Sequence, residues 1–174
     1  MANFVFKEWT SAAAESTNDI PNPNVYWKIA VVSKELNEKD YSEKNYAQLF
    51  SDTNIYVKGS SATTATKFDL VANISGISAV SDTDNSTDII APYIDLFNVV
   101  GDPSSPTKTM VTDKDAYGAV VWKEAGSPVV QTLVCYLDFG GKVRPNNQDF
   151  RIIFSGGDTQ TNATPGVILK YKGV

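Results

Sequence analysis

An acidic stretch in the middle of the chain carries oxygen atoms of the kind that bind calcium. Its candidate ligands alternate along the sequence and are Asp82, Asp84, Ser86 and Asp88. Calcium-binding EF-hand loops use such alternating oxygens, but they also need a glycine at the sixth position and a glutamate at the twelfth. Thr87 and Tyr93 occupy those positions here. The pattern is therefore incomplete, a solvated turn is the alternative interpretation, and we expect no bound metal or other cofactor.

The residue types that usually perform catalysis are missing or poorly placed. The chain has no histidine, which removes the commonest general base and transition-metal ligand. Its single cysteine, Cys135, lies within an apolar run, so we expect a buried structural thiol and no disulfide. Asp113 and Asp115 are close in sequence but are expected to face water rather than form a glycosidase pair. We therefore expect no enzymatic activity and no catalytic residues.

Charge and hydropathy exclude two further classes of partner. The net charge is −5, the pI is about 4.7 and the basic residues are scattered, so no positive stripe exists for nucleic acid. No segment approaches the roughly 20 apolar residues of a membrane helix. The first residues also lack the basic and apolar regions of a secretory signal. We expect a protein that is made in the cytoplasm and binds neither nucleic acid nor membrane.

The first 24 residues differ in character from the rest. Aromatic residues alternate in a first short strand, and a segment rich in Ala, Ser, Asn and Pro follows, in which the prolines disfavour helix. We expect residues 1–24 to form an extended arm, or a first strand plus loop, that contacts a neighbouring chain in a homo-oligomer. Residues 25–174 would form the sandwich domain. The expected interface residues are Phe4, Phe6, Trp9, Pro21 and Pro23.

The remaining sequence reads as short strands separated by clusters of Ser, Thr, Asn, Asp, Gly and Pro, a pattern typical of all-β domains. The expected strands lie at 25–32, 54–58, 67–74, 77–80, 88–100, 108–112, 117–123, 129–139, 150–154 and 167–171. One short helix at most is expected, over residues 41–50 with Ser42 as N-cap. The predicted fold is a single-domain antiparallel β-sandwich, jelly-roll or immunoglobulin-like, or a small barrel.

Residues 129–139 form the clearest predicted strand. Strict alternation would place Val129, Gln131, Leu133, Cys135, Leu137 and Phe139 on one face. It would place Val130, Thr132, Val134, Tyr136 and Asp138 on the other. Both faces carry apolar residues, so we expect a central strand with burial on both sides, ended by Gly140 and Gly141.

The C-terminal third resembles a hairpin found in small structural proteins of tailed bacteriophages. The likeness rests on the apolar run 129–139, its ending Tyr136-Leu137-Asp138-Phe139-Gly140, a polar turn, and the second run 149–154. The resemblance implies pairing between these two runs. It is a pattern over part of the chain, and no functional residue is carried over from it.

What the resemblance implies is a non-enzymatic component of a virion, made in the host cytoplasm. The first expectation is a capsid decoration, or cement, protein that binds the phage head and stabilises it, with the major capsid protein or other virion proteins as partners. One alternative is a neck, tail or fibre-base protein. Another is a carbohydrate-binding or host-adhesion module, which would need exposed, coplanar aromatic rings on one sheet face.

Overall fold

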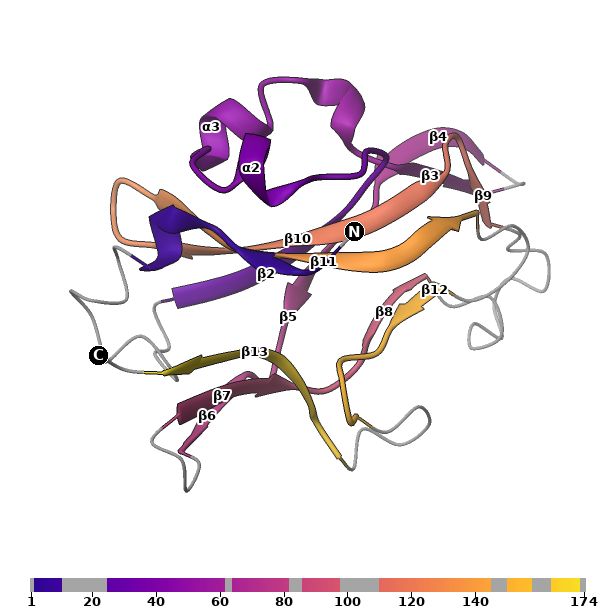
Figure 1. Ribbon diagram of the computed structural model, residues 1–174. Helices are drawn as coiled ribbons and strands as arrows, with labels where there is room; N and C mark the ends of the chain where they lie inside the picture. The colour runs from indigo at the N-terminus through magenta and orange to yellow at the C-terminus, as the bar shows by residue number, and fades with distance from the viewer. Residues whose placement is uncertain are drawn as a thin grey trace.

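The computed structural model shows two layers of strands with a short helical cap over the upper layer (Figure 1). It describes residues 2–10, 25–61, 64–81, 86–97, 110–144, 150–157 and 164–172. Every strand pair among these residues is antiparallel, and the sheets are open at their edges. The all-β prediction is therefore confirmed, and the barrel alternative is not what the chain adopts.

The upper layer is a five-stranded sheet in the order β1-β11-β10-β2-β5. Its strands are β1 (Phe4–Val5), β11 (Val130–Val143), β10 (Ala116–Ala125), β2 (Val25–Val32) and β5 (Val71–Ile74). The longest pairings join β10 to its two neighbours, β11 and β2. These three strands form the centre of the molecule.

Smaller sheets complete the sandwich. The lower layer contains the three-stranded sheet β13-β7-β6 and the two-stranded sheet β12-β8 (Figure 1). Their bounds are β13 (Gly166–Lys172), β7 (Ser86–Ala91), β6 (Ser78–Ser81), β12 (Phe150–Ile152) and β8 (Ile94–Phe97). A third small sheet at one end contains β4 (Thr64–Asp69), β3 (Lys58–Ser61) and β9 (Met110–Thr112).

The five-stranded sheet is buried on both faces. Alternate residues of β2 divide between two clusters: Trp27, Ile29 and Val31 belong to an inner core between the layers, whereas Ala30 and Val32 belong to an outer core beneath the cap. A strand covered on one side only would have polar residues at every second position. The apolar run of β2 therefore reflects a sheet with protein above and below it.

The cap that covers the outer core contains three one-turn helices instead of the single helix predicted over residues 41–50. They are α2 (Glu38–Tyr41), α3 (Tyr46–Leu49) and the 3-10 helix η1 (Thr53–Ile55). Asn37 and Asn45 are the N-caps of α2 and α3, and Asn45 forms a reciprocal capping box with Gln48. Ser42, the predicted N-cap, instead ends α2. Within the predicted range the helix therefore begins after Asn45 rather than after Ser42 and is shortened to α3.

A bulge in β11 overturns the predicted division of its side chains. Val121 pairs with Cys135 whereas Trp122 pairs with Leu133, so Val134 is an extra residue opposite β10. Val134 and Cys135 consequently both face the inner core, and Leu133 faces the outer core. The extra residue reverses the alternation, because one inserted position moves every later side chain to the other face.

The predicted end of this strand is also wrong. β11 continues through Gly140 and Gly141 to Val143, which pairs with Ala116. Both glycines have positive φ, of 72° and 153°, which residues with a side chain rarely adopt. Here the two glycines bend an irregular strand rather than terminate it.

The strand that follows β11 does not pair with it. β12 pairs with β8 in the lower layer, while β11 lies between β10 and β1. The hairpin implied by the resemblance to phage structural proteins is therefore absent from the described strand pairs. The two runs lie in opposite layers of the sandwich (Figure 1).

Candidate functional site

The N-terminal segment, residues 2–10, completes the edge of the five-stranded sheet. Phe4 and Val5 pair with Tyr136 and Cys135 of β11. The Phe6 amide then donates to the Val134 carbonyl at 3.0 Å, and residues 7–10 form one helical turn. The segment is thus an integral part of the sandwich.

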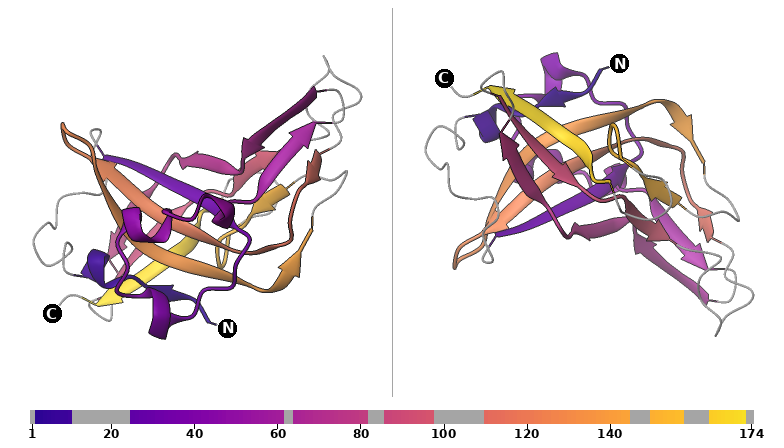
Figure 2. Two further views of the ribbon diagram at one scale, coloured as in Figure 1. Left: turned by 90° about the horizontal axis from the view of Figure 1, so that it is seen from above. Right: turned by 90° about the horizontal axis from the view of Figure 1, so that it is seen from below.

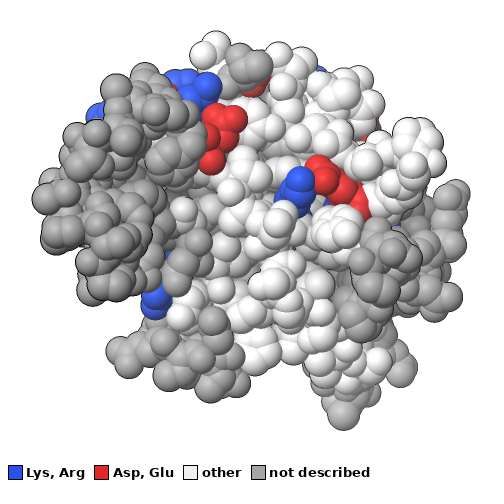
Figure 3. Space-filling model, turned by 180° about the vertical axis from the view of Figure 1, so that it is seen from behind, with Lys and Arg blue, Asp and Glu red and all other residues white. Residues whose placement is uncertain are grey.

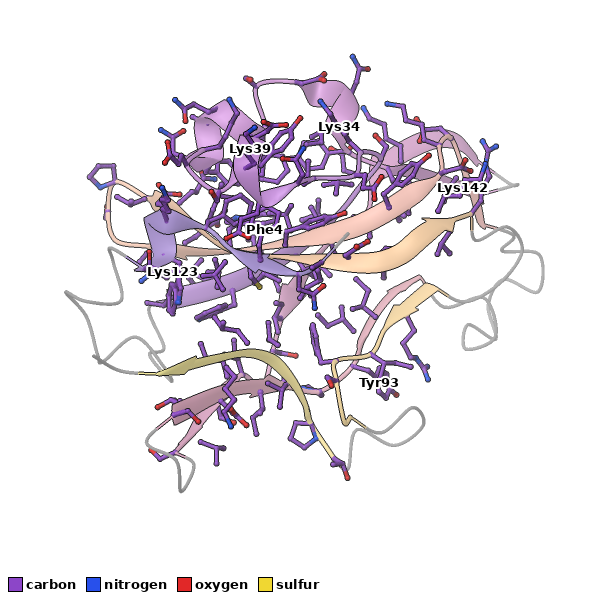
Figure 4. All side chains as sticks on the ribbon, viewed as in Figure 1. Phe4, Lys34, Lys39, Tyr93, Lys123 and Lys142 are labelled. Carbon is purple, nitrogen blue, oxygen red and sulfur yellow. The ribbon has the colours of Figure 1, made fainter. Side chains whose placement is uncertain are left out.

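The aromatic residues predicted to contact a neighbouring chain are buried in their own chain. Phe4 and Phe6 lie in the outer core and Trp9 in the inner core, with exposed fractions of 6%, 0% and 4%. Figure 4 shows Phe4 directed from β1 towards the cap. The sequence predicts that these aromatic side chains contact a neighbouring chain, but in this structure they fill the two cores of their own chain, because the sheet that they border is covered on both faces. The other two expected interface residues, Pro21 and Pro23, lie outside the described residues.

Two polar side chains extend the hydrogen bonding of β1 beyond its backbone pairs. Asn3 Oδ1 accepts from the Asp138 amide at 2.7 Å, and Glu8 Oε2 accepts from the Leu133 amide at 2.8 Å. The Lys7 amide also donates to the Ser42 carbonyl of the cap at 2.8 Å. The segment therefore satisfies the β11 edge from Leu133 to Asp138 and connects this edge to the cap.

The acidic stretch is only partly covered by the structure. Asp82 and Asp84 lie outside the described residues, while Ser86 and Asp88 are on β7. Ser86 is buried, and Asp88 Oδ1 lies 3.9 Å from Lys170 Nζ. No group of three or more His, Cys, Asp or Glu residues in the described ranges could hold a metal ion. The calcium site stays a sequence-based hypothesis.

The other candidate chemical groups have structural contacts. Asp113 Oδ1 accepts from the Lys58 amide at 3.0 Å, and Asp115 pairs with Lys142 and Arg144, each at 3.7 Å. Cys135 is buried, and this burial raises the pKa of its thiol to about 12. A thiol with such a pKa is protonated at neutral pH and is therefore a poor nucleophile.

The aromatic platform that a carbohydrate-binding module needs is not formed by the tryptophans. Trp9, Trp27 and Trp122 are all buried. Trp9 packs edge-on against Trp27 at 5.5 Å between ring centroids, and Lys123 Nζ lies 5.1 Å from the Trp9 ring centre. Their rings are therefore occupied by contacts within the chain.

A partly buried polar network lies at the hairpin end of the central strands. Glu124 pairs with Lys28 at 2.9 Å and accepts hydrogen bonds from Trp122 Nε1 and Gln131 Nε2 at 3.1 and 3.2 Å. Burial raises the pKa of the Glu124 carboxyl, but the three hydrogen bonds outweigh burial and hold this pKa below its usual value. The network joins β2, β10 and β11 by side chains as well as by backbone.

The edge opposite β1 has a different character and is the candidate binding surface. It contains β5, the connecting residues 75–77 and β6, and we call these residues 71–81 the rear edge. β5 ends the five-stranded sheet and β6 ends the three-stranded sheet, so both are edge strands on the side away from β1 (Figure 2). The rear edge has no charged residue, and Val71 and Val80 are 40% and 48% exposed.

Figure 3 views the molecule from the side of the rear edge, and most described atoms on this face belong to uncharged residues. Exposed edge strands usually carry lysine, proline or bulges that prevent pairing with another chain. Residues 71–81 have neither lysine nor proline. The sequence marks this candidate binding surface by a long run without charged residues. Only the sheet order shows that the run supplies the edge strands of two sheets.

Replacing Glu8 tests whether the hydrogen bonds of the N-terminal segment to β11 stabilise the fold. Glu8→Ala leaves the partly buried Leu133 amide without its acceptor, which should lower the free energy of unfolding by about 1–3 kcal/mol. Glu8→Gln retains an acceptor oxygen and should recover part of the loss in urea titrations. Glu43→Ala, which removes only the exposed pairing with Lys7, is the control and should leave the midpoint nearly unchanged. Equal midpoints for all variants would contradict this role.

Acid should weaken the Glu124 network. Since the pKa of this carboxyl is lower in the folded state, its stabilising effect is present above the usual value of 4.5 and is lost as the pH falls through the lower folded pKa. Urea titrations between neutral and acidic pH should show a smaller acid-induced loss for Glu124→Gln than for the natural chain. Parallel pH profiles for the two proteins would disprove the assignment.

No family model, curated protein or solved structure matches the chain. Among the described residues, no helix is long and apolar enough to cross a membrane. The function is therefore inferred from the surfaces and contacts of this chain.

Proposed function

We propose that the protein is a non-enzymatic structural component of a tailed-bacteriophage particle, in which it acts as a capsid decoration protein. The observation that carries this proposal is the uncharged rear edge, in which two consecutive strands, β5 and β6, are the last strands of two different sheets. Unpaired edges of this kind accept a strand or an apolar surface from a partner. The proposed partner is the major capsid protein.

The division of buried and exposed surface supports a role for the edges in binding. Both faces of the five-stranded sheet pack against protein, so neither face is free to present a broad binding platform. At the opposite side of this sheet, the N-terminal segment occupies the edge of β11 from Leu133 to Asp138. Among the described sheet edges, the rear edge combines exposed apolar side chains with a complete lack of charge.

Decoration would stabilise a particle through many weak contacts. A partner that binds only the assembled lattice shifts the equilibrium towards that lattice by mass action. When each copy contacts two neighbouring capsid subunits, the second contact is intramolecular and the combined affinity exceeds that of either contact. A compact domain with one uncharged docking edge suits this role, because the edge need bury only a modest area for each copy.

The proposal is tested on particles purified from a lysate of the phage whose genome encodes this chain. Quantitative mass spectrometry should find the chain in a constant ratio to the major capsid protein, with many copies in each particle. Particles without the chain would refute the phage role. A constant but very low copy number would instead assign it to the neck, tail or fibre base and refute decoration.

The rear edge is tested in the same particles by adding charge. Val71→Lys with Val80→Lys should reduce the bound copies at least about tenfold, because a partner would have to desolvate two ammonium groups. Val129→Lys with Val130→Lys is the matched control, since these residues are 62% and 61% exposed and lie outside this edge. Each variant should unfold within about 0.5 kcal/mol of the natural chain. Equal binding of both variants would exclude the rear edge as the docking surface.

A further inference from the structure

The N-terminal segment and β11 contact each other through a small and continuous set of residues. Residues 3–8 bind β11 through two backbone pairs, the Phe6 amide and the side chains of Asn3 and Glu8. The partner atoms belong to residues 133–138, which every copy of the chain contains. The same interface would therefore form equally well if the segment came from a second copy.

We infer that this segment can exchange between copies, so that residues 2–10 of one chain occupy the β11 edge of another. A reciprocal exchange closes a two-fold dimer and leaves no edge of β11 uncovered. The acceptor is a specific surface, the edge of β11 from Leu133 to Asp138, and the partner is a second copy of this chain. This inference does not depend on a role in a phage particle.

The length of the connecting chain permits exchange. Trp9 and Trp27 are in ring contact at 5.5 Å between centroids, so the end of the segment lies close to the start of β2. In the sheet order, β1 and β2 are three strand spacings apart, roughly 14 Å. Residues 11–24 connect them, and a chain of this length can reach roughly 46–50 Å. The connection therefore does not require the segment to bind its own β11.

The segment contacts the inner core through the side chains of Val5 and Trp9, and no described strand pair joins it to the lower layer. A cavity of about 210 Å³ lies between the segment and β13, and its lining includes Phe4, Val5, Ile168 and Lys170. β13 pairs with β7, and none of the described backbone pairs joins β13 to β1. Exchange thus requires the segment to leave β11 and the cap and to withdraw Trp9 from the inner core, but it breaks no described strand pair of the lower layer.

Protein concentration decides which form is populated. The contacts are the same in both forms, so their difference lies in chain entropy, and a short tether holds its own segment at an effective millimolar concentration. In dilute solution the segment binds the β11 edge of its own chain, whereas chains that fold at high local concentration exchange their segments. Because Phe4, Phe6 and Trp9 are buried, the choice is made during folding and seldom changes afterwards.

The single native cysteine provides a direct test. Val5 lies opposite Cys135 and packs against the same inner core, and directly opposed residues in antiparallel strands fall within the Cα separation that a disulfide spans. The variant Val5→Cys should therefore form a disulfide with Cys135 wherever the segment occupies β11. An equimolar mixture of nitrogen-15-labelled and unlabelled Val5→Cys chains is refolded in a glutathione buffer at low and high protein concentration.

Mass spectrometry of the peptides that link position 5 to Cys135 then separates the outcomes. At low concentration, each linked pair should come from one chain. At high concentration, pairs with one labelled and one unlabelled partner should increase towards about one half, the limit for random exchange, and a covalent dimer should appear on non-reducing gels. Val5→Ser should give neither product, and Val130→Cys reports dimers formed by exposed thiols, which lack this linkage.

Two results would overturn the inference. If linked pairs come from a single chain at every concentration, the segment does not exchange. If no link between position 5 and Cys135 forms while the variant is folded, the segment does not occupy the β11 edge. Either result leaves the proposed particle role intact, because that role is decided by the copy number in particles and by the rear-edge variants.

Discussion

Burial of the five-stranded sheet on both faces is the constraint on which the rest of the structure depends. A sheet covered on one side needs only one apolar face, but β2, β10 and β11 supply side chains to two cores at once. The inner core requires the lower layer. The outer core requires a second cover, which the helical cap and the N-terminal aromatics Phe4 and Phe6 provide. The cap and the segment are thus structural necessities of this sheet.

Because both faces of the five-stranded sheet are covered, only its edges are left to bind a partner. The two edges differ in their contacts and their charge. At β1, Asn3 and Glu8 place side-chain oxygens where a further strand would have placed carbonyls. At β5 and β6, no charged residue discourages pairing with another chain. This asymmetry underlies both proposals. The unsealed edge suits a different protein, and the sealed edge suits the identical segment of another copy.

Local sequence patterns predicted the structure correctly. The run from Val25 to Val32 was predicted with the bounds that β2 has, because β-branched and aromatic residues within it suit a pleated strand regardless of context. Prediction failed where one residue changes the outcome. The extra residue Val134 reverses the faces of β11, and the capping residue Asn45 shortens the predicted helix to α3. At bulges and helix ends, alternative hydrogen-bond patterns differ little in energy. Neighbouring elements therefore decide where a bulge or a helix end occurs.

For the candidate site, the sequence alone determined which residues are present: a single thiol, no histidine, and an uncharged run before an acidic one. It also determined an all-β fold, because strand-forming runs alternate with turn-forming clusters along the whole chain. Only the tertiary structure decided that Phe4, Phe6 and Trp9 lie inside rather than on a surface, and that residues 71–81 contain the edge strands of two sheets. Composition is a property of the chain, but exposure depends on which strands become neighbours. That choice depends on contacts between residues distant in sequence, such as Glu8 and Leu133.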